Sequence, residues 1–197
     1  MTRALSRAEL IHRGAVGAAA LLGTGGILAA TARASGPPAD DARSLATALR
    51  LEYVQAAFYE QAVQEGTIGP EMLDFARAAA AHEREHIAAL RALIGAAAGD
   101  PPRLDLPARG GGDVAFAQTA IVLENLSVRA LNGQVAHLGP RALAETARIA
   151  SVDARHGAWI RGIAGGTPEH HVLDEGRSDD EILDALRRAG LTPGTAS

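Results

Sequence analysis

The sequence contains no cysteine and no lysine, and aromatic residues make up only 3% of its 197 positions. The absence of cysteine excludes disulfide bonds, thiolate metal sites and a cysteine nucleophile. Every cationic side chain is an arginine, and the arginines are scattered, so no basic stretch indicates nucleic-acid binding. The scarcity of aromatic residues predicts a core of Ala, Leu, Val and Ile, which suits closely packed helices better than a sheet sandwich.

The first 34 residues have the pattern of an export signal. Three arginines precede an apolar, Gly/Ala-rich run at 14–32, and Ala-Arg-Ala at 32–34 is a small-residue cleavage site. The stretch SRAELIHRG resembles a twin-arginine signal, except that Ala8 stands where the second arginine is expected. We therefore expect an exported protein, periplasmic or extracellular. The alternative is an uncleaved membrane anchor, which the many glycines of the run disfavour.

Beyond the leader, the chain shows helical periodicity and almost no strand signal. Four long helices are predicted, at about 41–65, 70–97, 113–138 and 140–165. Proline just inside a helix start and glycine just past a helix end are typical boundary signals, and both occur here. Ser178 and Glu181 have the spacing of a capping box, which predicts a short fifth helix at 179–189.

The connections between these helices predict the topology. Few residues join the first helix to the second and the third to the fourth, whereas the Pro/Gly-rich segment GDPPRLDLPARGGGD joins the second to the third. Two antiparallel hairpins with one long crossover make an all-α four-helix bundle. We divide the chain into a signal peptide (1–34), a linker (35–40), the bundle (41–165) and a C-terminal tail with a short helix (166–197).

The two halves of the predicted bundle repeat each other. Glu83 and His86 recur 70 positions later as Asp153 and His156, and the Gly-Pro pair before each of these helices recurs at the same offset. A Leu-Glu pair in the first helix recurs in the third at an offset of 72. A repeat that includes helix-start, core and polar residues together is hard to obtain by chance.

Each of the four helices has an apolar seam, spaced by three and four residues, that an acidic residue interrupts near its middle. In the second and fourth helices a histidine follows the acid by three residues, on the same face. An unpaired buried carboxylate costs many kcal/mol or takes up a proton, so acids and histidines converging in one core indicate a bound cation. The six residues are Glu52, Glu83, His86, Glu124, Asp153 and His156.

Four carboxylates and two imidazoles are the ligand set of di-iron and di-manganese carboxylate bundles. We expect two iron ions, or manganese, with Glu83 and Asp153 bridging them and the other four residues as terminal ligands. Tyr59 lies on the seam of Glu52 and is a candidate partner of the ligands, or else a core residue with a satisfied hydroxyl. Asn125, beside Glu124, is a second candidate partner, or else a surface amide.

Two other interpretations stay open. Residues 82–86 read HEREH, which matches the zinc-protease motif with His82 and His86 as ligands and Glu83 as base. The repeat argues against it, because Val152 stands where a second His82 would be, and we expect His82 on the rim or surface. The other alternative is a non-catalytic bundle with a degraded metal site, which the shorter Asp153 in place of a glutamate would suit.

The segments LEYVQAAFY, HEREHIAAL, LENLSVRALNG and DARHGAWIR, behind a twin-arginine-like leader, resemble the exported ferritin-like domain family that includes desiccation-related proteins. The resemblance spans about residues 40–165 and implies a ferritin-like bundle with a di-metal site at the six residues above. The fold hosts oxidases, peroxide-handling proteins, iron stores and metal-free members, so it implies little about reaction. The leading hypothesis is redox chemistry on Fe(II), with O2 or peroxide as acceptor, in iron handling or stress protection.

Overall fold

The structure, a computed structural model, describes residues 39–104, 106, 111–167 and 174–191, and the predicted signal peptide lies outside these ranges. Within them all regular structure is helical, which confirms the all-α prediction. In chain order the elements are α2 (Ala39–Glu65), α3 (Pro70–Ile94), the 3-10 helix η1 (Gly95–Ala98), α4 (Gly112–Gln134), the 3-10 helix η2 (Val135–His137), α5 (Pro140–Ile163) and α6 (Asp179–Arg188).

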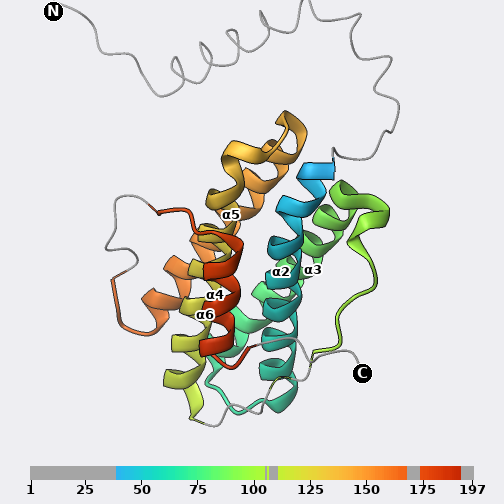
Figure 1. Cartoon of the computed structure of the whole chain (residues 1–197). Helices are drawn as coiled ribbons and strands as arrows, with labels where there is room; N and C mark the ends of the chain where they lie inside the picture. The colour runs from blue at the N-terminus through green and yellow to red at the C-terminus, as the bar shows by residue number, and fades with distance from the viewer. Residues whose placement is uncertain (1–38, 105, 107–110, 168–173, 192–197) are drawn as a thin grey trace, which may run out of the picture. The chain divides into compact units, whose positions relative to one another are not determined.

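The four long helices form two antiparallel hairpins. Helix α2 packs along α3, and α4 packs along α5, while α2 also contacts α4 and α3 also contacts α5 (Figure 1). Gly-Pro pairs begin α3 and α5, since proline at the first helical position lacks only an N–H that would be unpaired anyway. The connection from α3 to α4 is the long one, so the predicted crossover is present.

The predicted seams are buried or half-buried, with one exception. Val135 is 47% exposed, because the α-helix ends at Gln134 and a 3-10 turn follows. A 3-10 turn has three residues per turn and therefore rotates the chain away from the α-helical seam. The α-helix predicted at 113–138 therefore ends a few residues earlier than its pattern indicates.

The core is less aliphatic than the composition predicts. Phe58, Tyr59, Phe75 and Phe116 pack against one another at one end of the bundle, with ring centroids 5.2 to 6.2 Å apart. Most of these pairs meet edge to face, an arrangement that adds about 0.5–1.5 kcal/mol to the burial of each pair. Four of the six aromatic residues thus belong to one core cluster, and Leu, Ile and Ala form the other, with Tyr53 packed against it.

Helix α6 lies on the face that α4 and α2 form (Figure 1). Its apolar residues Ile182 and Leu186, with Leu191 just after it, are at most 1% exposed and join the main core cluster. The predicted capping box is present: Ser178 accepts from the backbone of Glu181, and the Glu181 carboxylate accepts from the backbone of Ser178. A helix of ten residues is marginal alone, so this packing stabilises it.

The segment before α6 is held against the end of α4. The backbone nitrogen of Arg177 donates to the carbonyl oxygen of Arg129 at 2.9 Å. Gly133 and Gly176 allow this approach, since a Cβ on Gly133 would lie 2.0 Å from the carbonyl oxygen of Arg177. The close contact between the two backbones therefore requires a glycine at position 133.

The stretch Gly112–His137, which comprises α4 and η2, is long and apolar enough to cross a membrane by length and composition. Its apolar window is 56% buried inside the bundle. A buried core helix passes the same test, so this feature is weak evidence for a membrane span.

Candidate metal centre

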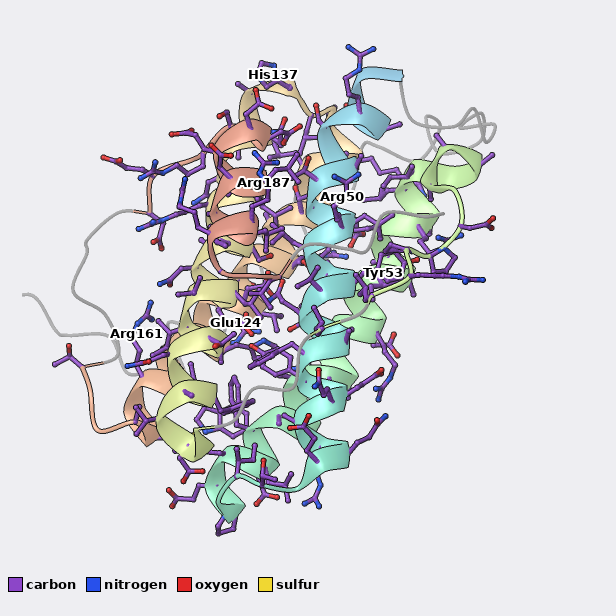
Figure 2. The ribbon with its side chains drawn as sticks, turned by 60° about the horizontal axis from the view of Figure 1, so that its bottom comes forward. Arg50, Tyr53, Glu124, His137, Arg161 and Arg187 are labelled. Atoms are coloured by element: carbon purple, nitrogen blue, oxygen red, sulfur yellow. The ribbon has the colours of Figure 1, made fainter. Side chains whose placement is uncertain are left out.

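Acidic and histidine side chains from all four long helices meet in the middle of the bundle. They are Glu52 from α2, Glu83 and His86 from α3, Glu124 from α4, and Asp153 and His156 from α5. The four acids are 0% exposed, and the two histidines are 7% and 3% exposed. Figure 2 shows Glu124 in the interior of the bundle, between the helices. The structure thus brings together all six residues that the seams predict.

The potential ligand atoms form two overlapping groups. They are Glu52, Glu83, His86 and Asp153 in the first group, and Glu83, Glu124, Asp153 and His156 in the second. Within each group the four ligand atoms lie within 4.8 Å of one another. Glu83 and Asp153 belong to both groups, which is the position expected of bridging ligands. The shorter side chain of Asp153 therefore reaches both groups.

Four buried atoms of the second group have no hydrogen-bond partner among the described residues. They are Glu83 Oε1, Glu124 Oε2, Asp153 Oδ1 and His156 Nδ1. Each buried polar atom left unpaired costs about 1–3 kcal/mol, so folded proteins contain few of them. A cation would satisfy three carboxylate oxygens and one imidazole lone pair together. These residues therefore fit a bound metal ion.

Burial and mutual repulsion raise the pKa of three of the four acids. Burial raises the pKa of Glu52 well above its usual value, and the charge of Glu83 adds to the effect. The pKa of Asp153 rises well above its usual value because of burial and then the charge of Glu52. Burial also raises the pKa of Glu124. Four carboxylates in one dry core thus resist carrying four charges unless positive charge joins them.

Glu83 and the two histidines favour their charged forms, because the pKa of Glu83 is lowered and the pKa values of His86 and His156 are raised. At Glu83 the imidazoles of His156 and His86 outweigh burial and lower the pKa to about 2. Burial lowers the pKa of both histidines, but the carboxylates outweigh it and raise the pKa of His86 to about 11 and that of His156 to about 9. Nδ1 of His86 lies 2.9 Å from Oε2 of Glu83 and 3.2 Å from Oε2 of Glu52. Protons thus provide the positive charge that a metal ion would otherwise bring.

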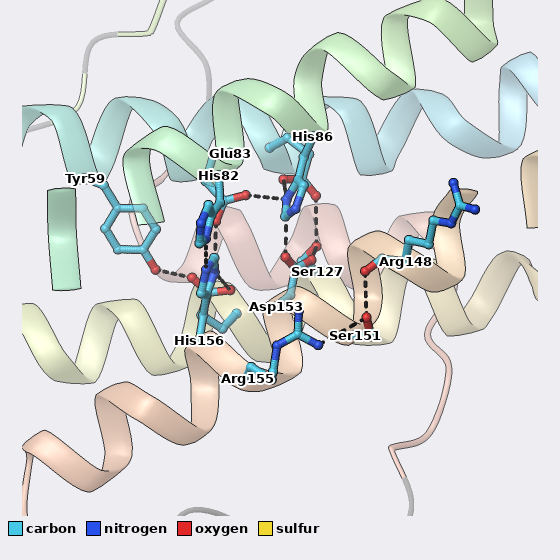
Figure 3. Close-up of polar contacts among 12 residues, drawn as sticks. Tyr59, His82, Glu83, His86, Ser127, Arg148, Ser151, Asp153, Arg155 and His156 are labelled. Atoms are coloured by element: carbon cyan, nitrogen blue, oxygen red, sulfur yellow. Dashed lines mark hydrogen bonds and ion pairs between the residues drawn. The ribbon is translucent and has the colours of Figure 1, made fainter. Parts of the chain in front are cut away.

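The two predicted partner residues differ in their contacts. The hydroxyl of Tyr59, which is 0% exposed, donates a hydrogen bond to Oε1 of Glu124 (Figure 3). Asn125 is half-buried, and its side-chain oxygen accepts from Arg161. Within the described part of the chain, no hydrogen bond links Asn125 to the six clustered residues. Tyr59 therefore contacts the cluster directly, whereas Asn125 lies outside it.

Ser127 is a site residue that the seam pattern did not predict. Its hydroxyl is fully buried, 2.6 Å from Oδ2 of Asp153 and 3.1 Å from Oε1 of Glu52 (Figure 3). Its single proton is donated to one of these two oxygens at a time, and the hydroxyl helps to orient both acids. Its spacing could have revealed it, because Ser127 follows Glu124 by three residues, the step at which histidine follows the acid in α3 and α5.

His82 is exposed, as predicted, yet it contacts the cluster. Its Nδ1 lies 2.9 Å from Nε2 of His156, and the two rings are nearly parallel (Figure 3). Burial and the charge of His156 lower the pKa of His82, which favours its neutral form. Neither group of ligand atoms includes His82, while His86 faces Glu52 and Glu83. The geometry therefore favours the acid-x-x-His interpretation of HEREH over the zinc-protease one.

Two antiparallel hairpins with a long crossover, around a buried cluster of acids and histidines from all four helices, define the class of ferritin-like carboxylate proteins. The family model of the ferritin-like domain matches residues 40–166. The chain therefore belongs to the ferritin-like domain family. No curated protein matches the sequence. The family match ends before α6, so the packed C-terminal helix lies beyond the matched domain.

Proposed function

We propose that this chain is an exported ferritin-like protein, related to the desiccation-associated members of the family, that binds two iron or manganese ions and oxidises Fe(II). The observation that supports this most is the convergence, on one place in the core, of four buried atoms that have no hydrogen-bond partner among the described residues: Glu83 Oε1, Glu124 Oε2, Asp153 Oδ1 and His156 Nδ1. Four such atoms are costly without a cation. Iron handling and protection against oxidative stress are the roles that this chemistry suits.

The cluster divides into natural ligand sets for two ions. Glu52 and His86 would hold one ion, Glu124 and His156 the other, and Glu83 with Asp153 both. Carboxylates and imidazoles suit iron and manganese, which when bound supply one-electron redox steps and polarise an oxygen species. The protein itself keeps bulk water away, since all four acids are 0% exposed. The hydroxyls of Tyr59 and Ser127 hold Glu124 and Asp153 in place.

The proposed reaction balances with either oxidant. Two Fe(II) ions, as substrate, give up one electron each. With O2 as acceptor, these two electrons and two protons produce hydrogen peroxide. With hydrogen peroxide as acceptor, the same two electrons and two protons produce two water molecules. Consumption of peroxide together with Fe(II) would remove two reagents that otherwise generate damaging radicals, which is the link to stress protection.

The test is aerobic addition of Fe(II) to protein purified without chelator, with near-ultraviolet absorbance and metal analysis as readouts. We expect two iron ions per chain and rapid oxidation. Glu83→Gln should abolish both, because Glu83 belongs to both ligand groups. The matched control is Glu85→Gln, an exposed glutamate two positions later, which should behave as the native chain. A folded native protein that takes up neither iron nor manganese would overturn the proposal and favour the non-catalytic alternative.

Export is the second part of the proposal and rests on the signal pattern in the first 34 residues. Expression of the full chain with fractionation of the cells tests it. We expect the protein outside the cytoplasm, with an N-terminus that begins after Ala34. A full-length chain that stays in the membrane fraction would support the uncleaved anchor.

A further inference from the structure

We propose that the two metal positions of this site are inequivalent, because His82 supports the ligand His156, whereas no residue in the described part of the chain supports His86 in this way. The inference rests on the proposed metal site and adds a positioning residue to it. It follows from a contact between two helices and from one place where the internal repeat fails. Figure 3 shows His82 and His156 side by side, with His86 on the other side of the cluster.

The ring of His156 has one inner and one outer nitrogen. Its Nδ1 faces the acids, 3.3 Å from Oε1 of Glu83 and 3.5 Å from Oε2 of Glu124, and has no hydrogen-bond partner among the described residues. Its Nε2 lies 2.9 Å from Nδ1 of His82. A neutral imidazole binds a metal only through the nitrogen that lacks a proton. Nδ1 of His156 is therefore the ligand atom, and Nε2 must hold the proton.

His82 is the acceptor for that proton. When Nε2 of His156 donates to Nδ1 of His82, the tautomer of His156 is set and its lone pair points inward. The two rings are nearly parallel, with an interplanar angle of 4° and centroids 5.1 Å apart, and the edge of Phe75 meets His156 from another direction. His82 is exposed, whereas His156 is buried.

The other histidine lacks this arrangement. The described polar contacts of His86 all use Nδ1, at 2.9 Å to Glu83, 3.2 Å to Glu52 and 3.4 Å to Asp153. Within the described residues, no hydrogen bond reaches its Nε2. The repeat explains the difference, because the counterpart of His82 at the offset of 70 is Val152, whose side chain accepts no hydrogen bond.

The consequence is one stronger and one weaker metal position. The stronger is the group that contains Glu124 and His156, and the weaker is the group that contains Glu52 and His86. Loss of a partner behind a ligating histidine typically lowers metal affinity about 10–100-fold. Because His82 is exposed, water can replace it in part, so we expect His82→Ala to weaken one position by about 10-fold and to leave the other unchanged.

Mn(II) titration of the full chain, followed by calorimetry and by electron paramagnetic resonance of free Mn(II), tests this inference. The native chain should bind two ions with unequal affinities. His82→Ala should bring the two affinities together, and His82→Asn should restore part of the difference, because its amide oxygen accepts a hydrogen bond. Val152→His should strengthen the weaker position. Glu85→Ala, an exposed change on the same helix, is the control.

A second readout follows the proton directly. In Zn(II)-loaded, 15N-labelled protein, the imidazole spectrum should show His156 with its proton on Nε2, and His82→Ala should increase the exchange of that proton with water. A native chain that binds two Mn(II) ions, with affinities and imidazole signals that His82→Ala does not change, overturns this inference alone. A native chain that binds no metal overturns the proposed function as well.

Discussion

Asp41, at the start of α2, accepts a hydrogen bond from the backbone nitrogen of Gly139, the residue that caps the start of α5, at 3.0 Å. The repeat produces a counterpart, in which Asp113 at the start of α4 accepts from the backbone nitrogen of Gly69, the cap of α3, at 2.6 Å. Each aspartate thus joins the first turn of its own helix to the start of a helix in the other hairpin. The negative charges also suit the positive ends of α3 and α5.

We predict that Asp41→Ala lowers the free energy of unfolding by roughly 1–2 kcal/mol and that Asp113→Ala lowers it by roughly 0.5–1 kcal/mol. The order follows burial, since Asp41 is 5% exposed whereas Asp113 is exposed and its hydrogen bond competes with water. Urea unfolding measures both losses. Asp41→Asn keeps an acceptor and should recover most of the stability, and Asp74→Ala, in an exposed ion pair with Arg77, should change little.

Tyr59→Phe tests the hydroxyl that contacts Glu124 without removing the ring from the aromatic cluster. We expect a loss of about 1–2 kcal/mol in unfolding free energy, because a fully buried acid loses a donor. Metal affinity should fall as well, since the carboxylate becomes free to turn. Urea unfolding and Mn(II) titration measure the two effects. Tyr53→Phe, whose half-buried hydroxyl accepts from Arg91, is the control and should leave metal affinity unchanged.

Ser127→Ala removes the hydroxyl that lies between Asp153 and Glu52. The variant leaves two buried carboxyl oxygens without this partner, so we expect a loss of about 1–3 kcal/mol in unfolding free energy. Metal affinity should fall several-fold at both positions, because Asp153 belongs to both groups. Ser151→Ala, an exposed serine on α5, is the control. An unchanged affinity in Ser127→Ala would show that packing alone orients Asp153.

Leu186→Ala tests whether α6 is part of the core. Leu186 is 1% exposed, so we expect a loss of about 2–5 kcal/mol in the free energy of unfolding. Arg188→Ala changes an exposed residue of the same helix and should have little effect. Urea unfolding of the full chain is the measurement. A loss under 1 kcal/mol, about the size of a surface effect, would mean that the bundle does not depend on α6.

The stability of the chelator-treated protein should fall as the pH rises above neutrality. His86 and His156 have pKa values of about 11 and about 9 when folded, against an ordinary value of 6.5, so the folded state binds more protons in that range. Their contribution is complete below pH 6.5 and is lost as the pH rises through 9 and then 11. The raised pKa values of Glu52 and Asp153 act in the same direction.

Urea unfolding with chelator at several pH values between 6 and 10 measures this decline. The contribution of Glu83 to stability depends on pH in the opposite direction, since its pKa of about 2 lies below the ordinary 4.5. That contribution is lost only in acid. It therefore does not offset the decline above neutrality. A free energy of unfolding that stays constant from pH 6 to pH 10 would contradict the prediction.

Much of the fold and most of the cluster could be predicted from the sequence, because both depend on periodicity along one chain. Helix starts at Pro70 and Pro140, and the faces on which Glu83 and His86 lie, follow from local spacing alone. The repeat then related Glu83 to Asp153 without any knowledge of distance. The position of each residue around its own helix is a local property, and a single sequence determines it.

Contacts between helices depended on the tertiary structure. The approach of Ser127 to Asp153, of Tyr59 to Glu124 and of His82 to His156 depends on how far each helix is rotated and shifted against its neighbour. The packing of α6 on α4 and α2 is of the same kind.

The sequence by itself determined which residues face the core, because that follows from 3.6 residues per turn. Only the tertiary structure decided which of them touch, because side-chain packing across all the helices sets rotation and register together.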